Sequence, residues 1–286
     1  MTFNDLIRRI IRVKRYFNYL FYLFKYTKNP FNILLSFLIY GKGRAILKNN
    51  TIINFEKRNT LGHLGHVLNE GWDIHNIGSD LILKKDDISL IQPNLGVLHE
   101  LNIYNYYNVN NKVVLDVGGF LGETAVFFSK MGAKKIIVYE PLKYHIDYIK
   151  KNIKLNNINA IVKSFAVSEY CGKETWYTTS MEGNSSFGLI RNKSGKAFEI
   201  NTVSWNYVLN DAVKHKVSLA KVDCEGGEKY LVNAKDKLIK SINYWIIEAH
   251  SKAIKDSLLQ KFKTNGFNLD KIEEIFDDIF MLYFSK

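Results

Sequence analysis

The chain has 286 residues, of which 47% are hydrophobic and 24% charged, a composition typical of a folded soluble protein and not of a disordered one. Its net charge is +12, and residues 1–48 hold ten Lys/Arg and one acid (10 − 1 = +9), against 30 − 27 = +3 for the rest. The two cysteines, Cys171 and Cys224, predict neither a disulfide framework nor a metal cluster, so we expect a reduced, cytoplasmic setting.

The N-terminal segment, residues 1–26, is predicted to be a basic amphipathic helix. Apolar residues recur there in steps of three and four: Phe3, Leu6, Ile10, Val13, Phe17, Leu20 and Phe24. This face suits peripheral binding to the inner face of a membrane, or docking on the catalytic domain or on a second subunit of a homo-oligomer. Neither this run nor 31–40 reaches the ~20 residues that span a bilayer, and we see no signal-peptide cleavage site.

The next segments predict an extension ahead of the main domain. Residues 44–55 have the pattern of a hairpin around the Asn49-Asn50 turn, and we expect short helices across 59–106. We therefore divide the chain into an extension, 1–58, and a domain, 59–286, with its core at 100–286.

From residue 112 strands and helices alternate, which predicts an α/β fold with right-handed parallel crossovers. The segment 173–202 interrupts the alternation and predicts an inserted hairpin. Two β-prone runs around Asp277-Asp278 predict a closing hairpin, so the last strand should be antiparallel. The predicted strands are 112–117, 134–140, 160–167, 218–223 and 243–250, and the helices include 121–131 and 143–155.

The stretch "VVLDVGGFLGETA" (113–125) places Gly118, Gly119 and Gly122 just after the first of these strands. Ligands of an open parallel sheet bind beyond the carboxyl ends of its strands. The spacing fails the G-x-G-x-x-G pattern of nicotinamide binding, and no Gly-Lys-Ser/Thr of a phosphate loop follows. Asp116 would repel a phosphate and suits a cationic or amino group.

An acid at the end of the next strand, Glu140, can accept both hydroxyls of a ribose. A ribose with a cationic partner and no phosphate points to S-adenosylmethionine, with adenine near Ala166. We expect contacts with the cofactor from the two loops and their neighbours: Asp116, Gly118, Gly119, Gly122, Thr124, Glu140, Pro141, Ala166 and Asp223.

The stretches "VVLDVGGFLGETAVFFSKMGAKKIIVYEP" and "SLAKVDCEGGE" resemble the FkbM family of S-adenosylmethionine-dependent methyltransferases, over residues 100–250. The resemblance implies a seven-stranded, Rossmann-like class I methyltransferase sheet and O-methylation of a hydroxyl, often on a sugar or natural product. It assigns Asp116, Gly118, Gly122 and Glu140 to the cofactor, and Asp223, Glu225 and Glu228 to a second motif. Family members often have Ala-Asn where this chain has Gly119 and Phe120.

An alcohol acceptor needs a general base, for which strand-end acids and histidines are candidates. We expect catalytic roles for Asp223, Glu225 and His250, and Glu248 shares a strand face with His250. Substrate contacts are expected from Ser185, Ser186, Glu248 and His250, with Trp176 or Trp205 offering a stacking face. For Glu228 we favour a structural role at a helix start. No metal site is expected.

The leading hypothesis is therefore an O-methyltransferase whose acceptor hydroxyl belongs to a glycan, a lipid-linked sugar or a small natural product. The alternatives are a nucleic-acid methyltransferase and a catalytically inactive, membrane-associated protein of the same fold. Nucleic acid is the less favoured partner, because the excess positive charge is confined to the N-terminus and the (N/D)-P-P-Y sequence of many exocyclic-amine methylases is missing.

Overall fold

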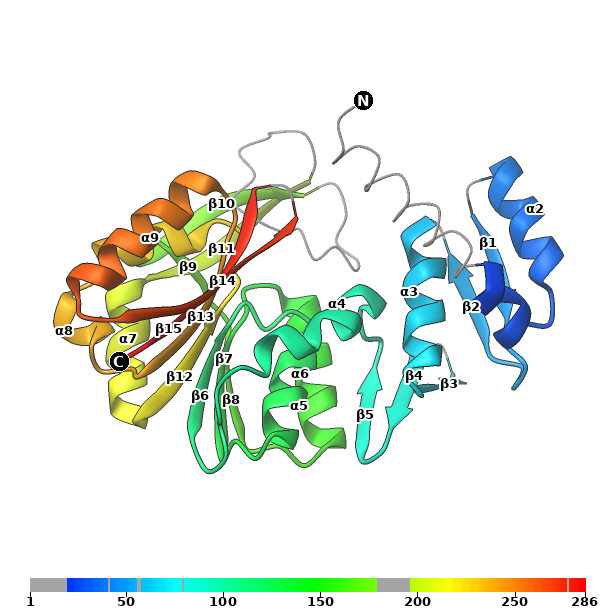
Figure 1. The fold of residues 1–286 in the computed structure, drawn as a ribbon, viewed down its shortest axis with the longest axis horizontal. Helices are drawn as coiled ribbons and strands as arrows, with labels where there is room; N and C mark the ends of the chain where they lie inside the picture. Colours follow the sequence, from blue (N-terminus) through cyan, green and yellow to red (C-terminus); the bar gives the residue numbers. More distant parts are fainter. Residues whose placement is uncertain (1–19, 41, 56–57, 79, 179–195, 277) are drawn as a thin grey trace. The chain divides into compact units, whose positions relative to one another are not determined.

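A computed structural model describes residues 20–40, 42–55, 58–78, 80–178, 196–276 and 278–286 (Figure 1). The chain forms two compact units, Met1–Glu100 and Leu101–Lys286. The division falls at the start of the predicted core, and residues 59–100 belong to the first unit. The predicted domain boundary near residue 58 stays a prediction.

The first unit begins, within the described residues, with a helical segment at 20–26, followed by α2 (Pro30–Tyr40). The strands β1 (Gly43–Ile46) and β2 (Ile52–Phe55) pair antiparallel around a turn in which Asn50 has a φ of 69°, as asparagine tolerates. This confirms the predicted hairpin at 44–55. Ile33 of α2 is fully buried, and α2 packs against β1.

The prediction of short helices over 59–106 is wrong for its middle part. The helix α3 (Arg58–Asn69) is followed by an antiparallel sheet of β3 (Asp73–Ile77), β4 (Asp80–Lys85) and β5 (Ile88–Ile91), and then by α4 (Leu95–Glu100). These strands are short and do not alternate strictly between apolar and polar residues, so their pattern is weak in the sequence. The turn between β4 and β5 uses Asp86 at a φ of 52°.

The second unit contains a seven-stranded sheet in the order β14-β15-β13-β12-β6-β7-β8. Its elements, after a 3-10 turn η1 (Leu101–Tyr104), are β6 (Val113–Val117), α5 (Glu123–Lys130), β7 (Lys135–Tyr139), α6 (Lys143–Leu155), β8 (Ala160–Lys163), α7 (Trp205–His215), β12 (Val217–Val222), η2 (Gly227–Asn233), α8 (Asp236–Ile239), β13 (Tyr244–Ala249), α9 (Lys252–Thr264), β14 (Asn268–Phe276) and β15 (Ile279–Ser285).

The centre of this sheet is parallel and buried. Strands β12, β6, β7 and β8 pair parallel, and every residue of β6 is buried, because α5 and α6 cover one face and α7, α8 and α9 the other (Figure 1). The strand β15 pairs antiparallel with β13, which confirms the predicted antiparallel last strand. The order reverses between β6 and β12, so the carboxyl ends of these strands border the expected ligand position.

The inserted hairpin is also confirmed. Strands β10 (Gly172–Thr178) and β11 (Lys196–Ser204) pair antiparallel, and β11 pairs parallel with β9 (Ala166–Ser168). The predicted strand 160–167 is therefore two strands, since the chain leaves the central sheet after Lys163 and joins this smaller one. No helix among the described residues is long and apolar enough to cross a membrane.

Candidate functional site

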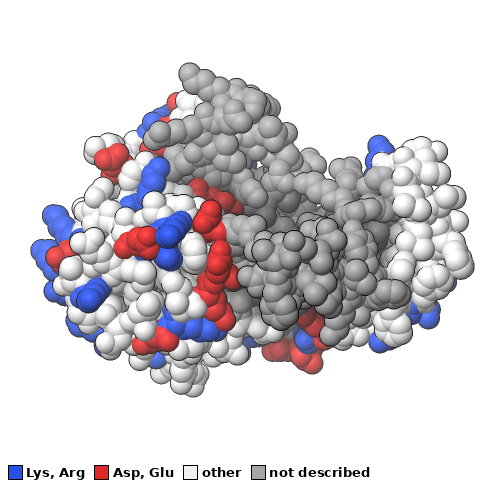
Figure 2. All heavy atoms as spheres, turned by 45° about the horizontal axis from the view of Figure 1, so that its top comes forward, with Lys and Arg blue, Asp and Glu red and all other residues white. Residues whose placement is uncertain are grey.

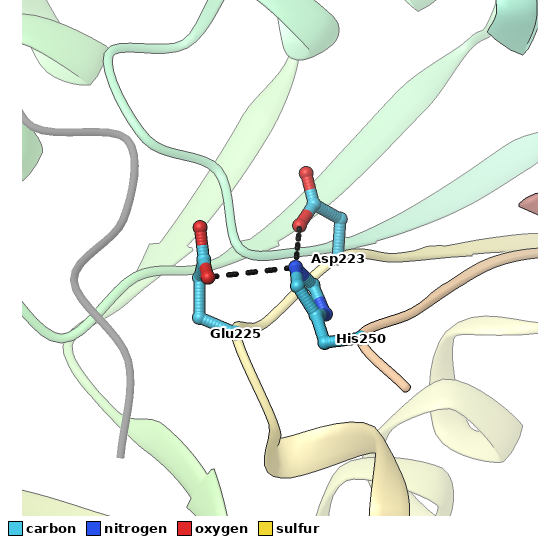
Figure 3. Close-up of side chains that lie close together, drawn as sticks. All are labelled: Asp223, Glu225 and His250. Atoms are coloured by element: carbon cyan, nitrogen blue, oxygen red, sulfur yellow. Dashed lines mark ion pairs between the residues drawn. The ribbon is translucent and has the colours of Figure 1, made fainter. Parts of the chain in front are cut away.

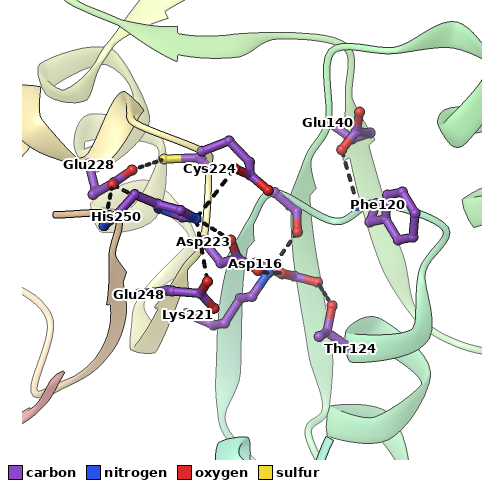
Figure 4. Close-up of polar contacts among 12 residues, drawn as sticks. Asp116, Phe120, Thr124, Glu140, Lys221, Asp223, Cys224, Glu228, Glu248 and His250 are labelled. Carbon is purple, nitrogen blue, oxygen red and sulfur yellow. Dashed lines mark hydrogen bonds and ion pairs between the residues drawn. The ribbon is translucent and has the colours of Figure 1, made fainter. Parts of the chain in front are cut away.

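The candidate site lies at the carboxyl ends of β6, β7, β12 and β13, where four strand–loop junctions meet (Figure 4). The side chains come from segments far apart in the sequence: the glycine loop after β6, Glu140 after β7, residues 223–228 after β12, and Glu248 and His250 at the end of β13. The parallel topology alone brings these segments to one edge of the sheet.

The glycine loop is packed against the loop after β12. Gly118 has a φ of 83°, and a Cβ atom placed on it would lie 1.7 Å from the carbonyl oxygen of Asp223. Gly122, with a φ of 94°, precedes α5 and lies beside Ile149 of α6. Only glycine fits these positions without moving the backbone. The glycines therefore serve first to bring two strand-end loops into contact.

Phe120, which stands where family members often have Asn, contacts Glu140 through its backbone. It adopts a φ of 46°, which is uncommon for a residue other than glycine. Its backbone N–H donates a hydrogen bond of 3.0 Å to Oε2 of Glu140, and its ring meets the His145 ring edge-on at 4.6 Å. The Phe120 backbone thus ties the glycine loop to the acid that was predicted to hold a ribose.

Glu140 is buried and oriented by three donors. Besides Phe120, the backbone N–H of Leu142 donates to Oε1 at 3.0 Å, and Nδ1 of His145 lies 3.0 Å from the same oxygen. A carboxylate offers about four lone-pair positions, so one remains on Oε2 for a ligand hydroxyl. Pro141 follows Glu140 directly, in the turn that leads into α6.

Asp116 is completely buried in β6 and does not face an open surface. Its Oδ2 accepts a hydrogen bond of 2.5 Å from Oγ1 of Thr124, and its Oδ1 lies 3.2 Å from Nζ of Lys221. The predicted contacts of Asp116 and Thr124 with the cofactor stay predictions. What the structure shows is a pair that anchors the start of α5 to β6.

Lys221 of β12 is a residue that the sequence predictions missed. Its ammonium is buried, donates a hydrogen bond of 2.7 Å to the carbonyl oxygen of Gly118, and lies 3.6 Å from Oδ2 of Asp223. Burial disfavours the charge, but Asp116 and Asp223 outweigh it and raise the pKa of Lys221. The signal was a single lysine inside the apolar strand "VSLAKV", which must find a partner when buried.

The loop after β12 presents Asp223 and Glu225 toward His250. The backbone N–H of Asp223 bonds to the carbonyl oxygen of Val117 at 3.0 Å, which holds the loop beside β6. Glu225 has a φ of 51° and precedes Gly226 with a φ of 102°. This turn directs the Glu225 side chain back over the strand ends, toward the imidazole (Figure 3).

His250 is surrounded by carboxylates. Its Nδ1 lies 2.9 Å from Oε1 of the completely buried Glu228. Its Nε2 lies 3.4 Å from Glu225, 3.4 Å from Glu248 and 3.8 Å from Asp223 (Figures 3 and 4). Burial disfavours the imidazolium, but the bond to Glu228 and the neighbouring carboxylates outweigh it and raise the pKa of His250 to about 10. At neutral pH His250 is therefore a cation.

Glu228 is the partner that holds His250 in place. Its Oε1 also accepts the backbone N–H of His250 at 3.1 Å, and its Oε2 accepts that of Gly226 at 2.8 Å. Burial opposes its charge, but the bonds from His250 prevail and keep the pKa of Glu228 below its usual range. The structural role favoured for Glu228 thus includes the orientation of a predicted catalytic residue.

Glu225 and Glu248 are the acids that titrate near neutrality. Burial, with Asp223 and Glu228 adding to it, raises the pKa of Glu225 to about 7 against the opposing effect of His250. Burial, followed by repulsion from Asp223, raises the pKa of Glu248 to about 8. Glu225 is 28% exposed and Glu248 15% exposed, so Glu225 is the more accessible proton acceptor.

The same side chains form a geometric set for a metal ion. Asp223, Glu225 and His250 offer ligand atoms that all lie within 4.8 Å of one another (Figure 3). A protonated imidazole has no lone pair for a metal, so binding would require His250 to lose its proton. The expectation that the protein needs no metal stays a prediction.

The predicted substrate residues differ in their position in the structure. Ser185 and Ser186 lie outside the described residues, and Glu248 and His250 meet at the site. Trp205 and Trp176 are buried, with exposed fractions of 2% and 6%, and Trp205 Nε1 bonds to the carbonyl oxygen of Gly227 at 3.0 Å. The suggestion that either ring offers a stacking face is therefore wrong, because both are already packed.

Ala166 lies three residues beyond the end of β8, in the short strand β9. It is buried in a small cluster with Trp176 and Ile200. The expected contact of this residue with an adenine stays a prediction. Pairing of β9 with β11 holds the backbone of Ala166 in the smaller sheet.

The network of side chains at the strand ends contains more acidic than basic groups. The carboxyl groups of Asp116, Asp223, Glu225, Glu228 and Glu248 outnumber the cations of Lys221 and His250 (Figure 4). Such a network favours a cationic ligand group, as the sulfonium of S-adenosylmethionine is. Together with the hydroxyl-accepting position on Glu140, the residues present fit this cofactor.

The sheet order, the glycine turn after β6 and the acid after β7 together define a class I methyltransferase. Residues 116–279 match the family described as "Methyltransferase FkbM domain", which is more than half of the chain. The chain belongs to this family, and S-adenosylmethionine is its methyl donor.

Three individual proteins illustrate the similarity. A protein of Methanocaldococcus jannaschii, "Putative protein N5-glutamine methyltransferase", is 39% identical over 59 residues, 21% of this chain and 30% of its own length. The ribosomal protein L11 methylase of Lactobacillus delbrueckii subsp. bulgaricus has a TM-score of 0.40 and 16% identity, over 68% of this chain and 80% of that one. The M. jannaschii protein TYW2, solved with AdoMet, has a TM-score of 0.39 and 15% identity, over 75% and 86%. The fold assignment rests on the strand order and the family match.

Proposed function

We propose that this methyltransferase methylates a hydroxyl group and that Glu225 is the general base. The observation that carries the proposal is the position of Glu225: 28% exposed, with its carboxylate 3.4 Å from the imidazole of His250. A base must be unprotonated and accessible near the working pH. Glu225 meets this condition, whereas His250, with a pKa of about 10, holds its proton.

This assignment divides the predicted catalytic residues by role. S-adenosylmethionine supplies the methyl group from its sulfonium. Glu225 accepts the proton that the acceptor hydroxyl loses, and the imidazolium of His250 stabilises the ionised carboxylate. Asp223, held by Lys221, orients the loop that carries Glu225, and Glu248 also lies 3.4 Å from the imidazole of His250. Alignment of the reacting groups supplies most of the rate.

For the acceptor we propose a sugar hydroxyl, on a glycan or a lipid-linked sugar, or the hydroxyl of a small natural product. Support comes from the acidic network, which suits deprotonation of a weak acid, and from the basic N-terminal segment, which suits an acceptor at a membrane. In this proposal the protein is cytoplasmic and held peripherally at the inner membrane face through residues 1–26. Homo-oligomer formation stays a prediction.

The M. jannaschii relative supports a second candidate acceptor, the side-chain amide of a protein glutamine. Against it stands the sequence "DCEG" at the end of β12, where many amine and amide methylases carry (N/D)-P-P-Y. Carboxylates suit removal of a hydroxyl proton and do not reproduce the contacts of that motif. The nucleic-acid acceptor is disfavoured by the same substitution.

The test uses the purified full chain and methyl-labelled S-adenosylmethionine. Glycan, lipid, protein and RNA fractions from cells lacking the gene are incubated with both, and the label is located by mass spectrometry. We expect one new O-methyl group in the glycan or lipid fraction. Label in protein or RNA would overturn the hydroxyl acceptor, and binding of the cofactor without transfer to any fraction would favour the inactive alternative.

A further inference from the structure

The helix α2 exposes apolar side chains, although its apolar composition predicts a buried helix. The sequence "PFNILLSFLIY" contains no charged residue, and a helix apolar all round is normally buried. Here Leu38 is 75% exposed, Phe31 72% and Leu35 58%. These three residues stand four and three positions apart, on one face, while Ile33 on the inner side is completely buried.

This face continues onto the helical segment before it. The rings of Phe24 and Phe31 meet edge-on at 5.2 Å, and Phe21 is 61% exposed. We call these residues together the α2 apolar face: Phe21, Phe24, Phe31, Leu35, Leu38 and Ile39, all exposed. Contiguous apolar surfaces of this kind mark sites that bind another molecule or a membrane.

The charges around the α2 apolar face are of one sign. Residues 20–55 contain no Asp or Glu, and their basic side chains are all exposed: Lys25, Lys28, Lys42, Arg44 and Lys48. Figure 2 shows a white surface at the right, where α2 lies, with blue groups at its edges. Nζ of Lys25 lies 5.8 Å from the centre of the Phe21 ring, so a cation lies at the edge of the α2 apolar face.

The positive charge around the α2 apolar face indicates which kind of molecule can bind there. A second copy of this chain would bring one basic rim against another, which is unfavourable. An anionic bilayer surface is complementary, because acyl chains contact the apolar face and lipid phosphates pair with the lysines. With 11 residues, α2 is about 16 Å long, so it can lie in the interface and cannot cross it.

We propose that the α2 apolar face and its basic rim form a docking surface for anionic lipid, which anchors the first unit to a membrane. Most of this surface, α2 and residues 42–48, lies outside the segment 1–26 considered above, and Phe21, Phe24 and Lys25 belong to that segment. It does not depend on methyl transfer, so either proposal can fail alone.

The test is sedimentation of the full-length protein with vesicles of phosphatidylcholine, with or without phosphatidylglycerol. We expect binding only to the anionic vesicles, weakened by salt. The double variant Leu35→Gln/Leu38→Gln should bind at least about tenfold more weakly, because two apolar side chains no longer enter the interface. Lys25→Gln/Lys42→Gln/Lys48→Gln should lose the preference for anionic lipid. Ile77→Gln, at a 61% exposed residue of β3, is the matched control and should bind like the wild type.

Three results would overturn the proposal. The first is that the wild-type protein stays in the supernatant with anionic vesicles. The second is that the Leu35→Gln/Leu38→Gln variant sediments as the wild type does. The third is that light scattering shows a dimer for the wild type and a monomer for the same variant. The last result would assign the α2 apolar face to a second copy. Circular dichroism establishes that each variant is folded, which its exposed positions lead us to expect.

Discussion

The ammonium of Lys221 donates a hydrogen bond of 2.7 Å to the carbonyl oxygen of Gly118, and this contact links the two loops that build the site. Lys221 belongs to β12 and Gly118 to the turn after β6, the strands between which the sheet order reverses. The same ammonium lies between Asp116 and Asp223. One buried cation therefore fixes the cofactor loop relative to the loop that carries the proposed base.

Replacing Lys221 should lower the free energy of unfolding. Lys221→Met leaves Asp116 buried without its cation, and we expect the free energy of unfolding to fall by about 3–5 kcal/mol, measured by urea denaturation. Adding Asp116→Asn should recover part of the loss, because no buried charge then stays unpaired. Lys173→Met removes an exposed cation paired with Glu199 and should cost at most about 1 kcal/mol. Equal effects of Lys221→Met and Lys173→Met would contradict this role.

The glycine loop should not tolerate a side chain at its first position. Gly118→Ala places a methyl group against the Asp223 carbonyl and forces a φ of 83° on alanine, so we expect loss of S-adenosylmethionine binding in calorimetry. The dihedral alone costs roughly 1–2 kcal/mol. Gly172→Ala in β10 has open space around its Cβ and is the control. Wild-type affinity in Gly118→Ala would show that the two loops need not touch.

The imidazolium of His250 should appear in the pH dependence of stability. Its pKa is about 10 when folded and 6.5 as the ordinary value, so the folded protein holds the proton more tightly. This stabilisation is complete below pH 6.5 and is lost as the pH rises to about 10. The difference in unfolding free energy between the wild type and His250→Gln should therefore decrease across that pH range. In a Glu228→Gln background the same decrease should occur at lower pH. A constant difference would mean that His250 is neutral when folded.

Chelation should leave methyl transfer unchanged. The imidazolium of His250 directs an N–H toward Glu225 and Glu248, so its Nε2 has no lone pair for an ion and the set Asp223, Glu225 and His250 lacks its nitrogen ligand. We therefore expect equal rates before and after EDTA, and no gain from added Mg²⁺ or Mn²⁺. Loss of activity in EDTA that Mg²⁺ restores would instead assign these side chains to a metal.

The parts of the site that the sequence predicted are those fixed by chain direction. Glu140, Asp223 and His250 each follow a strand with a clear apolar run, and parallel strands place such residues at one edge. Contacts made across the sheet were less predictable. Lys221 and Glu228 are buried by tertiary packing, so their partners, Gly118 and His250, are not visible from local spacing.

The same distinction explains the fold. The alternation of strands and helices after residue 112 predicted the central sheet, whereas β3, β4 and β5 are four to six residues long and do not alternate strictly between apolar and polar residues. The raised pKa values of His250 and Glu225 could not be predicted from the sequence either, because a pKa depends on burial and on neighbours that only the fold brings together.

The central claim is that Glu225 accepts the proton of the acceptor, and the pH profile of methyl transfer tests it most directly. Using the fraction that takes up label, we expect the wild-type rate to rise with pH and level off above about 7, as Glu225 ionises. Glu225→Gln should bind S-adenosylmethionine normally and transfer methyl groups about 10²–10⁴-fold more slowly, while Glu199→Gln, at an exposed residue of β11, transfers at the wild-type rate. A Glu225→Gln enzyme with the wild-type rate and profile would contradict the account.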